Sequence, residues 1–330
     1  MRFLLTRLSS LGDIVHTWPL ATTLARHGEV VWVVEERFLP LVAPHPAVAR
    51  AVPVATKRWR RVPWGTGTRL EAGRALHKLR KLAPDVALDP QGLVKSALWA
   101  VLAKVPRRLG FAHGFRRERA AGLFYTETVV PDSRCLHVVD LNLSLASALG
   151  FAPPFGTFPD ASFLRAHLPP PPPEATAVLL FPGSGQARKN VPPSFFGDLA
   201  RGLLGQGLPV TVWWGPGEHS LAAEVVRQAP GARLAPPTDL LQLAAAVAAA
   251  VAVVGGDTGP VHLAAAFGTP TVAVHTTTDP ARNGPRGPRV AIVSGAAAGA
   301  RRGKATTKAA RRVAPEEVLS ALQKLLAPSV

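Results

Sequence analysis

The sequence predicts an α/β protein made of two doubly wound units. Apolar runs of strand length alternate with segments of helical periodicity, and this alternation restarts after a proline-rich stretch. The chain has 330 residues, of which 47% are hydrophobic, enough for two domains with separate cores. Strands separated by helices pair in parallel, so each unit should contain a parallel sheet. Such sheets bind ligands beyond the carboxyl ends of their strands, and the two Rossmann-like units are expected to face each other across the cleft that holds the site.

The first half begins with an apolar strand at 2–8, and 13–28 then has helical spacing with Gly28 as its stop. Further strands are predicted at 30–36 and 85–89, and helices at 68–82 and 93–103. Residues 151–175 are rich in proline, and Pro169–Pro173 should form a stiff, extended spacer. We therefore expect an N-terminal domain at 1–165, a linker at 166–175 and a C-terminal domain at 176–330.

The second half repeats the pattern. Strands are predicted at 177–181, 209–215, 250–256 and 269–275, and helices at 193–204, from 218, at 238–250 and from 259. The segment 296–312 is basic and of low complexity, and 314–326 has the pattern of an amphipathic helix.

Charge and cysteine content restrict the function. Lys and Arg number 38 against 21 Asp and Glu, a net charge of +17, which favours an anionic partner such as nucleic acid, a phosphorylated substrate or an acidic membrane surface. A general bias toward arginine is the alternative. Cys135 is the one cysteine, which excludes an internal disulfide and suits a reducing compartment. With neither a signal peptide nor a membrane span in the sequence, a cytoplasmic location is expected.

The loop FPGSGQARKN is the best candidate for an anion site. Gly183 and Gly185 would let backbone N–H groups turn toward a ligand, Ser184 adds a hydroxyl, and Lys189 adds a positive charge. It is not a dinucleotide fingerprint, because Arg188 stands where the third glycine would be, and it lacks the Gly-Lys-Ser/Thr of a Walker loop. An ordinary flexible loop is the alternative.

A second candidate is VVGGDTGPVH. Asp257 or Thr258 could cap a helix that has Pro260 in its first turn, and the free N–H groups there suit a diphosphate. His262, about one turn further along, could point at the same anion. The alternative is that the two polar residues are only caps and that the histidine is packed in the core.

Other polar residues have less specific patterns. Glu218 starts a helix, where the dipole favours an acid, but it could also accept hydrogen bonds from ribose hydroxyls. Basic residues gather in the first half at 56–61, at Lys95 and at 107–119. They could bind nucleic acid or an acidic glycolipid, or form a solvated face.

The loop RLSSLGDIVHTWP, at 7–19, places Asp13 where a strand turns into a helix. A carboxylate is a poor neighbour for phosphate, so this turn serves either as a helix start or for chemistry other than anion binding. The sequence contains no HExxH or DxD motif and no histidine cluster with ligand spacing, so no metal site is predicted. It has no GxSxG motif, which disfavours a serine hydrolase.

Several strings together resemble one family. SSLGDIVHTWPL, WVVEERF, KRWRR, DPQGLVKSA, RERAAGLFY and GGDTGPVHLAAAFGTPTVAVHTTTDP are similar, in this order, to the lipopolysaccharide heptosyltransferases, glycosyltransferase family 9. Within the family the strings are most similar to the heptosyltransferase I branch. The resemblance spans nearly the whole chain.

The resemblance implies a GT-B fold and a metal-independent, inverting glycosyltransferase without cofactors that moves heptose from ADP-heptose to the acidic Kdo-lipid A core. By position, Asp13 matches the proposed catalytic base and Lys189 the catalytic lysine that faces the donor diphosphate. The matched donor-binding positions are Ser184, Gly185, Lys189, Glu218, Asp257, Thr258, Gly259 and His262. The matched acceptor-binding positions are Ser10, Arg60, Arg61, Lys95 and Arg117.

The family also implies a monomer that binds peripherally to the cytoplasmic face of the anionic inner membrane. GSGQARK departs from the family, which often has paired hydroxyl residues there, and VHTTTDP replaces its commoner turn. Heptosyltransferase II, or a family member with another sugar or acceptor, therefore stays open. A basic nucleic-acid-binding protein is the non-enzyme alternative, although no nucleic-acid motif supports it, and the missing GxGxxG disfavours an oxidoreductase.

Overall fold

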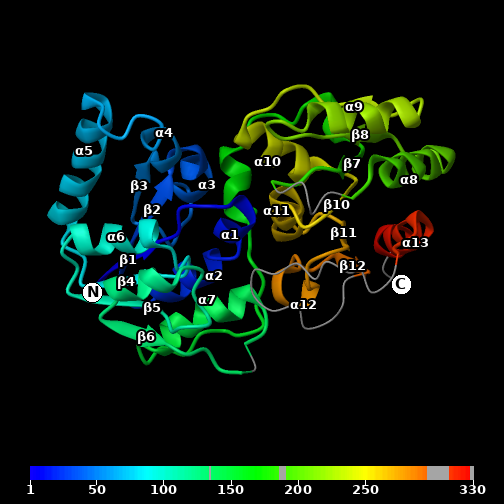
Figure 1. Ribbon diagram of the computed structural model, residues 1–330. Coiled ribbons are helices and arrows are strands. Elements are labelled where there is room, and N and C mark those ends of the chain that lie inside the picture. Colours follow the sequence, from blue (N-terminus) through cyan, green and yellow to red (C-terminus); the bar gives the residue numbers. More distant parts are fainter. Residues whose placement is uncertain (134, 186–190, 296–311, 328–330) are drawn as a thin grey trace. The chain divides into compact units, whose positions relative to one another are not determined.

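The computed structural model describes residues 1–133, 135–185, 191–295 and 312–327. Its contacts divide the chain into two compact units, Met1–Thr157 and Phe158–Val330. Each unit contains one six-stranded sheet in which every strand pair is parallel (Figure 1).

The first unit has the strand order β3-β2-β1-β4-β5-β6. This is the 3-2-1-4-5-6 order of a doubly wound sheet, which reverses direction between β1 and β4. The strands are β1 (Arg2–Thr6), β2 (Glu29–Glu35), β3 (Arg50–Val54), β4 (Val86–Asp89), β5 (Arg107–Phe111) and β6 (Glu127–Val129). The loops that follow β1 and β4 are therefore neighbours at the switch point.

Helices cover both faces of this sheet. The helices are α1 (Leu11–Val15), α2 (Trp18–Ala25), α3 (Leu39–Val42), α4 (Thr56–Trp59), α5 (Thr66–Leu82), α6 (Val94–Leu102) and α7 (Val138–Ser147). On one face Leu4, Val31 and Val52 pack against Leu79 of α5 and Trp99 of α6. Helices α2 and α7 lie against each other and contact β2 and β5. Burial of these valine and leucine side chains on both faces is the main stabilising term of such a sheet.

The second unit repeats the plan with the order β12-β11-β10-β7-β8-β9. Counted from β7, this is again 3-2-1-4-5-6, with the switch point between β7 and β10. The strands are β7 (Val178–Phe181), β8 (Val210–Val212), β9 (Arg233–Leu234), β10 (Ala252–Gly255), β11 (Thr271–His275) and β12 (Val290–Ser294).

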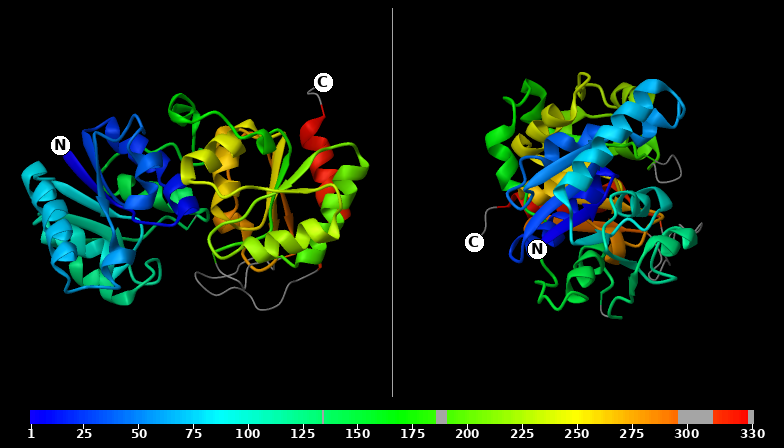
Figure 2. Two further views of the ribbon diagram at one scale, coloured as in Figure 1. Left: turned by 90° about the horizontal axis from the view of Figure 1, so that it is seen from above. Right: turned by 90° about the vertical axis from the view of Figure 1, so that its left-hand side faces the viewer.

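Its helices are α8 (Pro193–Gly205), α9 (His219–Gln228), α10 (Leu240–Ala249), α11 (Gly259–Phe267), α12 (Pro280–Asn283) and α13 (Pro315–Leu326). Helices α8, α9 and α13 share one core with the sheet, in which Phe196, Leu199, Val225 and Leu322 are buried. Figure 2 shows α13, in red, beside the sheet and α8. Helices α10 and α11 pack together, and α11 contacts β10 and β11.

Most elements expected from apolar runs are present, including the final helix. The prediction of a single helix at 13–28 is wrong. The segment forms two helices, α1 and α2, separated at His16 and Thr17. Pro19 has no N–H to donate to the carbonyl four residues earlier, so a continuous helix would lose that bond. Strands β3, β5, β6 and β9 lack a clear apolar run; for example, Arg107 and Arg108 begin β5 and Pro53 lies in β3. Strand β12 has an apolar run, VAIV, but was not predicted as a strand.

The proline-rich segment 169–173 lies within the second unit. Pro172 has the extended backbone expected of a polyproline stretch (φ −66°, ψ 153°), and a 3₁₀ turn at Pro173–Ala175 leads into β7. The expected domain limits at 165 and 176 stay predictions. Most of the low-complexity segment 296–312 lies outside the described residues.

Gly255 provides a test of the packing at the switch point of the second unit. A Cβ there would lie 2.8 Å from Cγ2 of Val261 and 3.0 Å from Cβ and the carbonyl oxygen of Phe181. We expect Gly255→Ala to lower the free energy of unfolding by roughly 1–3 kcal/mol, as overpacking does, in a urea titration. Gly205→Ala is the control, because a Cβ there meets no atom within 4 Å and its stability should be unchanged or slightly higher. Equal stabilities for the two variants would contradict the tight contact.

Candidate active site

The loop after β1 holds a buried ion pair between Arg7 and Asp13. The Arg7 side chain is 3% exposed, and its Nη2 contacts Oδ1 of Asp13. Its Nη1 donates a hydrogen bond of 2.7 Å to the carbonyl oxygen of Pro90, in the neighbouring loop after β4. A buried guanidinium requires a counter-ion and hydrogen-bond acceptors, and this one has both. Arg7 therefore ties together the two loops at the switch point of the first unit, while Asp13 balances its charge.

The second carboxylate oxygen of Asp13 has other partners. Its Oδ2 accepts hydrogen bonds from the backbone N–H of Ser10, at 3.1 Å, and from the Ser10 hydroxyl, at 3.0 Å. Nη2 of Arg117 lies 3.7 Å from the same oxygen. The Asp13 side chain is 15% exposed, whereas that of Arg117 is 57% exposed. The carboxylate is thus held from the protein side by Arg7 and approached from the solvent side by Arg117.

These neighbours determine the ionisation of Asp13. Burial by itself would raise the pKa of its carboxyl group, but the charges of Arg7 and Arg117 and the N–H of Ser10 outweigh burial and hold the pKa well below its usual range. Asp13 is therefore a carboxylate at neutral pH, a hydrogen-bond acceptor that can take a proton.

The loop after β4 is fixed by a buried acid, Asp89. Its Oδ1 accepts hydrogen bonds from the backbone N–H groups of Gln91 and Gly92 at 2.9 and 3.1 Å. Its Oδ2 accepts from the hydroxyls of Ser96, at 2.9 Å, and Tyr125, at 2.7 Å. Burial raises the pKa of Asp89, and these four donors only partly offset that effect.

The same loop contacts the loop after β1 directly. Oε1 of Gln91 accepts a hydrogen bond of 2.8 Å from the backbone N–H of Leu8. Gly92 has a φ of +67°, and a Cβ there would lie 2.9 Å from Cβ of Arg116, so glycine is required. The loop that offers its Pro90 carbonyl to Arg7 is consequently rigid.

The structure brings Ser10, Asp13 and Arg117 together, but within the described residues the other expected acceptor residues make no hydrogen bond or ion pair with these three. Arg60, Arg61 and Lys95 are exposed, and none takes part in an ion pair among the described residues. Arg60 and Arg61 follow β3 and Lys95 lies in the first turn of α6, so all three lie beyond the carboxyl ends of strands. Their acceptor role stays a prediction.

Sequence reasoning missed Arg7 as a member of this site. Its partners Asp13 and Pro90 lie in two loops, and the second is 83 residues away along the chain. A signal was available, because an arginine directly after a buried strand has to find a buried counter-charge.

In the second unit the loops after β7 and β8 meet at Glu218. A Cβ on Gly183 would lie 2.3 Å from the Glu218 carboxyl carbon, so that side chain covers the backbone of Gly183. Oε2 of Glu218 also accepts a hydrogen bond of 2.9 Å from the N–H of Gly215. Ser184 is 8% exposed beside them. The expected residues Ser184 and Glu218 thus belong to one cluster, Gly185 is the next residue, and Lys189 lies outside the described residues.

The loop after β10 contains the other expected donor residues. Thr258 has the extended backbone of an N-cap, and Gly259 begins α11. Nε2 of His262 lies 3.4 Å from Oδ1 of Asp257, and His262 is 5% exposed. Asp257 therefore contacts the histidine, and the cap position belongs to Thr258. Pro260, without an N–H, occupies the first turn, where it suits the helix start.

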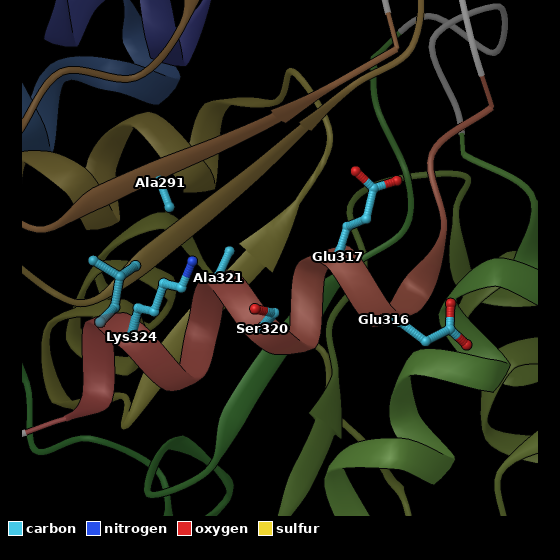
Figure 3. Close-up of a pocket in the computed structure, with 7 residues that line it drawn as sticks. Ala291, Glu316, Glu317, Ser320, Ala321 and Lys324 are labelled. Atoms are coloured by element: carbon cyan, nitrogen blue, oxygen red, sulfur yellow. The ribbon is translucent and has the colours of Figure 1, made fainter.

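The hollow shown in Figure 3 lies elsewhere in the second unit. It has a volume of about 670 Å³ and lies between α13 and β12. Its lining residues are Ala291, Glu316, Glu317, Ser320, Ala321, Lys324 and Leu325. Ala291 is near the beginning of the edge strand β12, whereas every expected site residue follows the end of a strand. The hollow contains none of the expected residues and is not part of the candidate site.

Among the described residues, no group of three or more His, Cys, Asp or Glu side chains is close enough to hold a metal ion. No described helix has both the length and the hydrophobicity needed to span a bilayer.

Comparison with known proteins identifies the family. The model of glycosyltransferase family 9 (heptosyltransferase) matches residues 72–312. Lipopolysaccharide heptosyltransferase 1 of Pseudomonas aeruginosa is 35% identical over 293 residues, which cover 87% of this chain and 82% of the relative. The chain belongs to glycosyltransferase family 9. The expected fold, GT-B with two Rossmann-like units, and the expected activity class, a glycosyltransferase, are therefore both confirmed.

Other relatives agree with this assignment. Lipopolysaccharide heptosyltransferase 1 of Escherichia coli K12 is 32% identical over 291 residues, covering 85% of this chain and 89% of the relative. The solved structure of the E. coli heptosyltransferase WaaC with ADP superposes with a TM-score of 0.79 at 27% identity, covering 98% of this glycosyltransferase and all of that chain. The range matched by the family model includes Lys95, Arg117 and the loops of the second unit, while Arg7 and Asp13 precede it.

The Arg7–Asp13 pair can be measured by a double-mutant cycle in this glycosyltransferase. Asp13→Ala leaves a buried guanidinium without its counter-ion, so we expect it to lower the free energy of unfolding by roughly 3 kcal/mol at pH 7. In the double variant with Arg7→Met, part of that loss should be recovered, because no buried charge is left unpaired.

The pH dependence of the free energy of unfolding is a control for this cycle. The pKa of Asp13 is lower in the folded than in the unfolded chain, so the stabilisation is present above the ordinary pKa of about 4 and is lost as the pH falls below it. Strictly additive effects at pH 7 would show that the two side chains do not interact.

Proposed function

We propose that this glycosyltransferase moves heptose from ADP-heptose to the Kdo-lipid A inner core, with inversion and without a metal ion. The observation that carries the proposal is the Asp13 carboxylate, ionised and fixed at the carboxyl edge of the first sheet. The relatives support the sugar and the acceptor, since they are named lipopolysaccharide heptosyltransferases, and one solved relative contains ADP.

Asp13 acts in this proposal as the general base. The acceptor hydroxyl loses its proton as it attacks the anomeric carbon, and a carboxylate within hydrogen-bond reach takes that proton. Inversion requires the hydroxyl to approach opposite the leaving diphosphate, so the base and the diphosphate-binding groups have to come from different sides of the sugar. In this proposal the base is Asp13 of the first unit, and the diphosphate-binding groups are those of the glycine-rich loops of the second unit.

Arg117 links acceptor binding to the strength of this base. Arg7 is buried and keeps its position, but Arg117 is more than half exposed and lies 3.7 Å from Asp13. Phosphates or carboxylates of an acidic acceptor compete for the Arg117 guanidinium. As Arg117 turns toward them, Asp13 loses one of the charges that lower its pKa and becomes a stronger base when substrate is present.

The donor side stabilises negative charge. When the bond to the sugar breaks, charge grows on the ADP diphosphate, and the backbone N–H groups at the start of α11, around Thr258 and Gly259, can donate hydrogen bonds to its oxygens. Ser184, Gly185 and Lys189 supply a hydroxyl, a backbone N–H and a positive charge from the other loop. His262, held by Asp257, supports the start of α11, and Glu218 accepts hydrogen bonds from the ribose.

The alternative within the family is heptosyltransferase II or an enzyme for another sugar or acceptor, because the loop GSGQARK departs from the family pattern. In either case we propose a monomer that works at the cytoplasmic face of an anionic membrane, where a lipid-borne acceptor resides.

Asp13→Asn tests the base. The amide keeps the shape, and its one oxygen can accept a hydrogen bond from either Arg7 or Ser10, while its NH₂ group, a donor, takes the place of the other carboxylate oxygen. The amide cannot take a proton. We expect turnover to fall by roughly 10²–10⁴-fold, while the dissociation constant for ADP stays the same. Turnover is measured by ADP release with ADP-heptose and Kdo-lipid A.

Glu29→Gln is the matched control for this experiment, since Glu29 is an exposed acid of the first unit, 58% exposed, that pairs with Arg2. Its turnover should equal that of the parent chain. A folded Asp13→Asn protein with parental turnover would rule out Asp13 as the base.

The donor class has a separate test. ADP should raise the melting temperature of the protein, and UDP and GDP should raise it less. Lys189→Ala should reduce the ADP shift, because the variant lacks a positive charge at the diphosphate. Lys324→Ala, in α13, is the control and should keep the full shift. Stronger stabilisation by UDP than by ADP would contradict the proposed donor.

A further inference from the structure

An exposed apolar cluster lies in the turn between α4 and α5, which we name the α4–α5 turn and define as residues 60–70 (Figure 1). The exposed fractions are 60% for Val62, 80% for Trp64 and 55% for Leu70. A tryptophan rarely presents most of its surface to water. Single exposed apolar residues are common and need no explanation, but three of them within nine positions require one. Leu123, 85% exposed, is an example of a single exposed residue elsewhere in the first unit.

The backbone of the turn is held by hydrogen bonds. The Val62 carbonyl accepts hydrogen bonds from the Thr68 hydroxyl, at 2.8 Å, and from the Gly65 N–H, at 3.2 Å. The Arg69 guanidinium lies 5.8 Å from the centre of the Trp64 ring. These contacts hold the backbone of the turn, so its apolar side chains are presented to solvent from a defined position.

The inner side of the same segment is anchored. Trp59, five positions before Trp64, donates a hydrogen bond of 2.8 Å to Glu71 and packs 6.1 Å from the ring of Trp99. Arg58 forms ion pairs with Glu71 at 2.8 Å and with Glu36 at 3.1 Å. Trp59 is thus anchored in the fold by a hydrogen bond and by ring packing. Trp64, by contrast, makes no hydrogen bond among the described residues.

The turn and the adjoining helix α4 are also positively charged. Lys57 of α4 and Arg60, Arg61 and Arg69 of the turn are exposed, and none forms an ion pair in the described part of the chain. The nearby acids Glu36 and Glu71 both pair with Arg58, so these three side chains together carry one negative charge against the four cations. The surface therefore combines an exposed indole, two aliphatic side chains and unpaired cations.

We propose that the α4–α5 turn docks the protein on an anionic lipid bilayer, with Trp64, Val62 and Leu70 in the headgroup region. Tryptophan prefers that region, and each nearby cation gains energy from the negative surface. Nucleic acid fits less well, because Arg69 covers one face of the indole and the two aliphatic side chains have no role in base stacking. The inference rests on the proposed function only in that a lipid-borne acceptor explains why the protein needs a membrane contact.

Sedimentation with vesicles tests the surface in the full-length protein. We expect binding to vesicles of phosphatidylcholine and phosphatidylglycerol, and little binding to phosphatidylcholine alone. Trp64→Ala should weaken vesicle binding about tenfold, because it removes the largest apolar group from the contact. Leu123→Ala is the matched control and should bind like the parent chain. Melting curves of both variants should equal the parent's, since both side chains are exposed.

A charge variant separates the two contributions. Lys57→Gln combined with Arg69→Gln should weaken binding by about fivefold per lost charge at low salt. The difference should disappear at high salt, where the surface field is screened. Parental binding by Trp64→Ala, an equal loss in Leu123→Ala, or equal binding to both kinds of vesicle would each overturn the proposal. So would salt-sensitive binding to single-stranded DNA that Trp64→Ala abolishes, since this would make the turn a nucleic-acid surface.

Activity assays keep this proposal distinct from the proposed function. Trp64→Ala should transfer heptose normally to a deacylated acceptor in solution and more slowly to the acceptor embedded in vesicles. If the parent chain transfers no heptose to either acceptor but shows Trp64-dependent vesicle binding, the proposed function fails and the docking surface stands. If the parent chain transfers heptose normally and Trp64→Ala does not change vesicle binding, the docking surface fails and the proposed function stands.

Discussion

Parallel pairing of the strands is the constraint on which the rest of the structure depends. In a parallel sheet all carboxyl ends lie at one edge, so the loops that follow the strands meet there regardless of their distance along the chain. In the first unit this constraint brings the loop after β1 against the loop after β4, and Arg7 reaches Pro90. In the second unit it brings Glu218, after β8, against Gly183, after β7.

The two edges have different electrostatics, although the sheets share one strand order. In the first unit an acid, Asp13, is surrounded by Arg7, Arg117 and a backbone N–H, and its pKa is lowered. In the second unit the start of α11 offers backbone N–H groups, and the acid there, Asp257, is directed to His262. The first edge therefore contains an ionised acid held between two arginines, and the second contains the positive end of a helix. The same strand order thus carries two different sets of polar groups.

The sequence predicted those parts of the fold that depend on burial. Strands such as 30–36 and 269–275 are continuous apolar runs because both faces are covered, and they were predicted close to their true bounds. Edge strands such as β6 and β9 are short and partly exposed and carry no such signal. Asp13 and the glycine-rich loops were predicted as site residues from local pattern and family resemblance. The contacts of Arg7 were not, because no local pattern specifies a partner 83 residues away.

In the proposed mechanism, a strongly lowered pKa weakens Asp13 as a base, and the two arginines beside it differ in a way that limits this loss. A carboxylate stabilised by two guanidinium groups is always ionised but binds protons weakly, so it would be a poor base if both charges stayed in place. One of the two, Arg7, is buried and keeps the carboxylate oriented; the other, Arg117, is exposed and lies at the longer distance. Orientation and basicity are therefore assigned to different arginines. Only the exposed arginine can respond to an anionic ligand, since moving Arg7 would also break its bond to Pro90 and expose the junction of the two loops.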